Sequence, residues 1–282
     1  MSPPVELIWR RTVDGVLLHG ALTGSGARRG LLLVHGAWGS FYATPVFRLM
    51  HQATEKGLMA LSMNGRGHDL GTLGDGEPCI GFMRDIFDQA PLDLDTAAGV
   101  LTEAGVEQFV VVAHSYGAHR AAYWLAENQP SEVVGFVLVS PAAYIDTTAR
   151  WFVDGAVEHH IARAAAAVAA GTPEQLIVMS SNAPVPMVGE ARTVLSTFAP
   201  DTLANSARHV PRVRVPMLVT VGAREPSGYR QAADEVTAAA SDAEQAVFDD
   251  DHYYNQDPAG FTDTIWEWID RRQLLKIEEG TS

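Results

Sequence analysis

Residues 109–122 have the sequence Phe-Val-Val-Val-Ala-His-Ser-Tyr-Gly-Ala-His-Arg-Ala-Ala, and this stretch decides the fold. It begins with a run of apolar, mostly β-branched residues, which predicts a strand buried on both faces, as in parallel sheets. It continues into good helix formers over Ala118 to Glu127. Between the two lies Ala113-His114-Ser115-Tyr116-Gly117. The stretch therefore predicts a strand, a very tight turn and a helix, with a serine at the turn.

The serine at this turn, Ser115, has a chemical use. A sharp turn pushes its hydroxyl beyond the end of the strand, and the backbone N–H of Tyr116 begins the helix. That N–H can stabilise an oxyanion, aided by the positive end of the helix dipole. Because the helix folds back against the strand, the neighbours must be small, as Ala113 and Gly117 are. The alternative is a serine that only caps the helix.

Strands and helices alternate along most of the chain. Two antiparallel edge strands are expected at 5–10 and 15–23. Further strands are expected at 31–34, 58–63, 133–139, 216–221 and 246–249, and further helices near 44–56, 91–105, 229–240 and 261–275. This alternation predicts an α/β fold, a mostly parallel sheet with helices on both faces. Ligand sites in such sheets lie at the carboxyl ends of the strands.

The strand signal disappears between residues 142 and 212. Helices are expected there near 154–170, 173–179 and 190–198, separated by prolines. We expect this span, 142–212, to be a helical lid over the carboxyl ends of the strands. The core into which it is inserted would consist of residues 1–141 and 213–282.

Composition narrows the class of protein. The chain has 282 residues, of which 47% are apolar, so it can bury a sizeable core. Its formal net charge of −14 disfavours binding to nucleic acid or to an anionic membrane. Cys79 is the only cysteine, which excludes a disulfide within the chain and fits a reducing cytosol. We see no signal peptide and no apolar run of about 18 residues, and expect a cytoplasmic protein.

A second motif, His35-Gly36-Ala37, directly follows a predicted buried strand. Gly36 permits an unusual backbone conformation. The N–H of Ala37 could then point at the same oxyanion as the N–H of Tyr116. The alternative is an ordinary glycine turn.

Four motifs in chain order resemble the α/β-hydrolase family. They are His35-Gly36-Ala37, Ala113-His114-Ser115-Tyr116-Gly117, Gly222-Ala223-Arg224-Glu225 and Asp251-His252. The second resembles the nucleophile elbow G-x-S-x-G, with Ala113 in place of the first glycine. The resemblance implies an eight-stranded, mostly parallel sheet with helices on both faces and a small helical lid.

The resemblance also implies catalytic roles. Ser115 would be the nucleophile, and His252, after the last strand, would be the general base. Glu225 lies three residues after a strand-ending glycine, where the family keeps its triad acid; Asp146 is the reserve candidate for this role. The order serine, acid, histidine is the order of the family. The oxyanion hole would be formed by the N–H groups of Ala37 and Tyr116.

A serine hydrolase of this kind would cleave a carboxylic ester, a lactone or a thioester through an acyl-enzyme. It would need no metal and no organic cofactor, and its partner would be a small-molecule acyl substrate. Trp38 and Trp151 are candidates to line the substrate pocket, although core packing explains each equally well. The alternatives are hydrolysis of a C–C bond or acyl transfer by the same triad, and a homologue that binds a ligand without turning it over.

A last motif, Asn64-Gly65-Arg66-Gly67-His68-Asp69, resembles the stretch after the fourth strand of many family members. The resemblance implies that it supports the fold rather than the chemistry. The pair His68 and Asp69 suggests metal binding only if further ligands lie close by.

Overall fold

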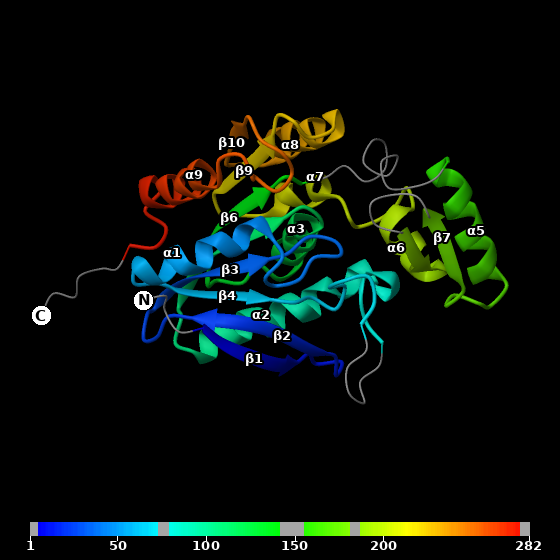
Figure 1. Cartoon of the computed structure of the whole chain (residues 1–282), viewed down its shortest axis with the longest axis horizontal. Coiled ribbons are helices and arrows are strands. Elements are labelled where there is room, and N and C mark those ends of the chain that lie inside the picture. The colour runs from blue at the N-terminus through cyan, green and yellow to red at the C-terminus, as the bar shows by residue number, and fades with distance from the viewer. Residues whose placement is uncertain (1–4, 73–78, 142–154, 181–186, 277–282) are drawn as a thin grey trace, which may run out of the picture.

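The computed structural model describes residues 5–72, 79–141, 155–180 and 187–276. Its main sheet contains β1 (Val5–Arg11), β2 (Leu17–Thr23), β3 (Arg29–Val34), β4 (Met59–Met63), β5 (Gln108–His114), β6 (Val133–Val139), β9 (Met217–Gly222) and β10 (Ala243–Phe248). The strand order is β1-β2-β4-β3-β5-β6-β9-β10 (Figure 1). The pairs β1–β2 and β2–β4 are antiparallel, and the other neighbours are parallel. The predicted eight-stranded, mostly parallel sheet is confirmed.

Helices cover both faces of this sheet. They are α1 (Leu49–Glu55), α2 (Ala90–Glu103), α3 (Tyr116–Asn128), α7 (Ser206–His209), α8 (Ser227–Ala239) and α9 (Pro258–Arg271), with short 3-10 turns η1 (Pro45–Arg48), η2 (Phe82–Arg84), η3 (Phe87–Gln89) and η5 (Val210–Arg212). Successive residues of β3 alternate between two cores, because side chains of a strand point to opposite faces. Leu32 packs in the core that includes residues of α2, α3 and α8. Leu31 and Leu33 pack in the core that includes residues of α1 and α9.

The central strand β5 has the burial that its composition predicts. Residues from Phe109 to Ala113 are completely buried, and they alternate between the two cores. Because both faces are covered, the strand is a rigid base for the turn that follows it. This rigidity matters for the site, since Ser115 lies directly after the strand.

The span between β6 and α7 differs from the expected all-helical lid. Its described part contains α5 (Val157–Ala169), β7 (Leu176–Ser180), β8 (Met187–Glu190) and α6 (Ala191–Phe198). Two of the expected helices are found. The prediction of a helix at 173–179 is wrong. Most of this range belongs to the strand β7, which pairs with β8 in an antiparallel manner.

The strand signal in β7 is a short alternation. Leu176 and Val178 are half exposed, whereas Ile177 and Met179 are buried, which is the period of a strand. Figure 1 shows α5, β7 and α6 together at one end of the molecule, on the side to which the arrowheads of β3 and β6 point. Within the described ranges, no helix is long and apolar enough to cross a membrane.

Candidate active site

The turn between β5 and α3 has the geometry of a sharp elbow. Ser115 has φ 55° and ψ −121°, a backbone conformation that a residue with a side chain rarely adopts. Its backbone N–H is held by the carbonyl oxygen of Val139 at 2.7 Å, so the neighbouring strand fixes the turn. A Cβ atom on Gly117 would collide with the carbonyl oxygen of His35. The small residue at 117 therefore lets α3 pack back against the end of β3.

The loop after β3 lies beside this elbow. A Cβ atom on Gly36 would be 3.0 Å from the Cβ of Ser115, so the two turns are in close contact. Ala37 follows in the same loop, and Tyr116 is the first residue of α3. N–H groups in the first turn of a helix point out of its N-terminal end. The two motifs therefore lie next to each other in the fold.

His35 holds the loop in shape as a neutral side chain. Its Nδ1–H donates to the carbonyl oxygen of Gly36 at 2.7 Å, and its Nε2 accepts the N–H of Gly65 at 3.0 Å. Burial lowers the pKa of His35 from 6.5 to about 3, because the charged form would lose its hydration. The imidazole therefore stays neutral at physiological pH and can accept that hydrogen bond.

Glu225 and His252 meet across two loops that are 27 residues apart in sequence. The Nδ1–H of His252 donates to Oε1 of Glu225 at 2.5 Å. The Glu225 side chain is fully buried, whereas 23% of the His252 side chain is exposed. Oε2 of Glu225 accepts the backbone N–H of Gly222 at 2.6 Å and the hydroxyl of Ser140 at 2.8 Å. Each carboxylate oxygen is therefore satisfied, and one of them faces the imidazole.

The acidic residues before His252 shape its loop. Asp250 is buried and accepts the backbone N–H groups of Asp251, Gln256 and Asp257. Asp249 instead pairs with Arg224 at 2.9 Å. The loop that presents the imidazole is thus closed by one buried carboxylate.

The rings of two other residues lie close to the His252 ring. The His114 ring is 4.5 Å away and the Tyr229 ring 4.8 Å away, measured between centroids. The Nε2–H of His114 also donates to the carbonyl oxygen of His252 at 3.0 Å. Burial and the nearby His252 lower the pKa of His114 well below its usual range, so it is neutral. Since His114 immediately precedes Ser115, these contacts bring the His252 loop to the elbow.

A chain of hydrogen-bonded hydroxyl groups that begins at Glu225 was not predicted from the sequence. Ser140 accepts a hydrogen bond from the hydroxyl of Tyr254 at 2.8 Å, and Tyr254 accepts one from Thr220 at 2.9 Å. This direction follows because the Ser140 proton is already donated to Glu225. The available signal was that Ser140 directly follows β6, at the same edge of the sheet.

Of the two predicted pocket residues, one is described. Trp38 is partly buried in the loop after β3, with its ring 5.1 Å from the ring of Phe82, which in turn lies 5.6 Å from the ring of Tyr116. These aromatic side chains lie beside the elbow. Trp151, and the alternative acid Asp146, lie outside the described residues.

Comparisons with known proteins give the family. The model of the alpha/beta hydrolase family matches residues 31–264, and the chain belongs to this family. No curated protein sequence matches the chain.

The fold is similar to that of several solved structures. An esterase from Pyrococcus furiosus is 17% identical, with a TM-score of 0.64 over 98% of this chain and 93% of that one. Est1E from Butyrivibrio proteoclasticus, solved with ferulic acid bound, is 14% identical, with a TM-score of 0.69 over 94% and 99%. A dienelactone hydrolase from Anabaena variabilis is 14% identical, with a TM-score of 0.61 over 98% and 100%. At these identities the likeness shows a shared fold.

Proposed function

We propose that the protein is a serine hydrolase that cleaves a carboxylic ester, a lactone or a thioester. Ser115 is the nucleophile, His252 the general base and Glu225 the acid that orients His252. The N–H groups of Ala37 and Tyr116 form the oxyanion hole. Membership of the alpha/beta hydrolase family supports hydrolase chemistry, and the triad is our assignment.

The observation that carries this proposal is the hydrogen bond from His252 to the buried Glu225 carboxylate beside the elbow. An Nδ1–H held by a carboxylate leaves Nε2 unprotonated, which is the tautomer that a general base needs. Glu225 is kept in that orientation by Gly222 and Ser140.

The reaction then follows in two halves. His252 Nε2 takes the proton of Ser115 as its oxygen attacks the acyl carbon, and the negative charge moves to the carbonyl oxygen. Two backbone N–H groups stabilise that charge where it develops. The bond to the leaving group then breaks, and His252 protonates that group. In the second half, His252 takes a proton from water, which attacks the acyl-enzyme, and His252 then returns the proton to Ser115 as the acid product leaves.

The proposed bond type is supported by what the similar structures are called. They include an esterase and a dienelactone hydrolase, and a third structure, Est1E, holds ferulic acid, an aromatic carboxylic acid. An aromatic group of the substrate would find a partner in the partly buried Trp38 ring beside the elbow. We propose that residues 142–212 cover this site.

Hydrolysis of p-nitrophenyl esters of increasing acyl length, by wild type and by Ser115→Ala, tests the proposal. Turnover by wild type and its loss in the variant are expected, with unchanged thermal unfolding. A fluorophosphonate probe, which labels an activated serine, should modify wild type only.

Labelling without turnover of any ester would reject the carboxylic ester and leave a lactone, a thioester, C–C hydrolysis or acyl transfer. Neither labelling nor turnover would reject the hydrolase and favour a protein that only binds its ligand. Substantial activity in Ser115→Ala would reject the nucleophile.

A further inference from the structure

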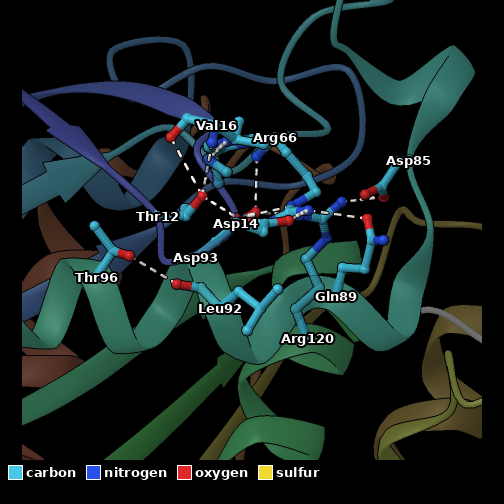
Figure 2. Close-up of polar contacts among 12 residues, drawn as sticks. Thr12, Asp14, Val16, Arg66, Asp85, Gln89, Leu92, Asp93, Thr96 and Arg120 are labelled. Carbon is cyan, nitrogen blue, oxygen red and sulfur yellow. Dashed lines mark hydrogen bonds and ion pairs between the residues drawn. The ribbon is translucent and has the colours of Figure 1, made fainter.

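Five charged side chains, four of them buried, form a cluster of ion pairs and hydrogen bonds (Figure 2). This two-arginine cluster consists of Asp14, Arg66, Asp85, Asp93 and Arg120. They come from the β1–β2 turn, the loop after β4, the end of η2, and helices α2 and α3. Asp85, Asp93 and both arginines are buried. The cluster therefore connects five separate segments at the edge of the sheet where Ser115 lies.

Arg120 is the member of the cluster on α3, the helix that follows the elbow. Its guanidinium pairs with Asp85 and lies 3.9 Å from Asp93. Its Cζ is 5.1 Å from the centroid of the Tyr116 ring, a cation–π distance. Arg120 is one turn after Tyr116 on α3, so side chains at these positions lie on the same face. The guanidinium, fixed by two carboxylates, thus fixes the side chain of the residue whose N–H would contact the oxyanion.

Arg66 and Asp93 act on the loop that contacts the second proposed oxyanion donor, the turn with Ala37. Asp93 accepts the backbone N–H of Arg66 at 2.8 Å and its Nε–H at 2.9 Å. The guanidinium of Arg66 also donates twice to Asp14, at 2.7 and 3.0 Å. These bonds fix the loop that includes Gly65, whose N–H donates to His35 at the start of the Gly36-Ala37 turn.

Glycines leave room for this arrangement. A Cβ atom on Gly65 would be 2.8 Å from an Arg120 nitrogen, and one on Gly67 would be 2.8 Å from the Asp85 carboxylate. The loop therefore approaches the guanidinium more closely than a residue with a side chain could.

We propose that Arg120 is a positioning residue for the oxyanion hole, acting through the ring of Tyr116. The cluster as a whole orients both proposed donors, Tyr116 through Arg120 and Ala37 through His35. This inference rests on the proposed function. Burying ion pairs is costly and often adds little net stability compared with apolar packing, so a role in fixing geometry is a reason to keep them.

The test compares Arg120→Lys with wild type in ester hydrolysis, counting active sites with a fluorophosphonate so that only folded enzyme contributes. Lysine keeps the positive charge, but it lacks the planar guanidinium that contacts the Tyr116 ring and pairs with the carboxylates. We expect kcat to fall by about 10- to 100-fold with little change in KM, less than the about 10²- to 10³-fold loss when one oxyanion donor is removed. Arg271→Lys is the matched control, because Arg271 makes two hydrogen bonds to Glu244 on an exposed surface.

A tetrahedral trifluoromethyl ketone inhibitor gives a second readout. Its inhibition constant should rise in Arg120→Lys by the same factor as kcat/KM falls, because both report stabilisation of the oxyanion. Equal kcat per active site in Arg120→Lys and wild type would overturn the positioning role. So would a rise in KM alone.

Tyr116→Leu keeps the backbone N–H and removes the ring, and it serves if Arg120→Lys does not fold. It should reproduce the loss in kcat, and the double variant should be no worse than either single one, since Arg120 acts through the ring. Additive losses, or wild-type kcat in Tyr116→Leu, would overturn the inference. A wild type that neither labels nor turns over esters would instead reject the proposed function, so the two failures are distinguishable.

Discussion

Replacing His35 by glutamine should make folding less sensitive to acid. The buried imidazole has a pKa of about 3, against 6.5 in its ordinary state. Between these values the unfolded chain binds a proton that the folded protein excludes, so stability falls as pH drops below about 6.5 and continues to fall toward about 3. Above that window the group contributes no pH dependence.

The size of the effect follows from linkage. One proton costs about 1.4 kcal/mol per pH unit, so going from about pH 8 to about pH 5 should remove about 2 kcal/mol of stability through His35 alone. Glutamine can still accept the N–H of Gly65 and donate to the Gly36 carbonyl, but it does not titrate. The stability difference between the two pH values should therefore be about 2 kcal/mol smaller in His35→Gln.

The measurement is urea unfolding of wild type and His35→Gln at several pH values. His114 titrates in both proteins and cancels in the comparison. His51→Gln is the control, because it makes the same change at an exposed histidine of α1. It shows how much a histidine-to-glutamine substitution alone alters the pH dependence of the unfolding free energy. An unchanged loss of stability with acid in His35→Gln would refute the reasoning.

Two other substitutions test the site. Glu225→Gln should lower kcat by up to about 10⁴-fold, as measured with p-nitrophenyl esters. Since Gly222 and Ser140 donate to Oε2, the amide NH₂ would face His252 and stabilise the wrong tautomer; near-wild-type kcat would mean that the acid is elsewhere, with Asp146 the next candidate. Gly117→Ala should destabilise folding by about 1–3 kcal/mol in urea unfolding, because its Cβ would collide with the carbonyl oxygen of His35. An unchanged unfolding midpoint would show that α3 can move away from β3 without cost.

Much of the architecture could be predicted because its signals are local. A run of apolar, mostly β-branched residues such as 109–113 is typical of a strand buried on both faces, and it is completely buried in the structure. Small residues around Ser115 predict a tight elbow, because only they let a helix fold back on its strand. The error at 173–179 has a local cause too. The exposed Leu176 and Val178 alternate with buried residues over only four positions, too few to outweigh the helices expected on either side.

The sequence alone also predicts which residues could react. Ser115, Glu225 and His252 each follow a predicted strand, and parallel strands bring their carboxyl ends to one edge. What the tertiary structure decided is which groups touch. The tertiary structure places His252 within hydrogen-bond distance of Glu225, and Ser140 on the other carboxylate oxygen. It also pairs Arg120 with Asp85, 35 residues away, beside the Tyr116 ring. No local pattern encodes such distances, because they result from how the sheet and its helices pack.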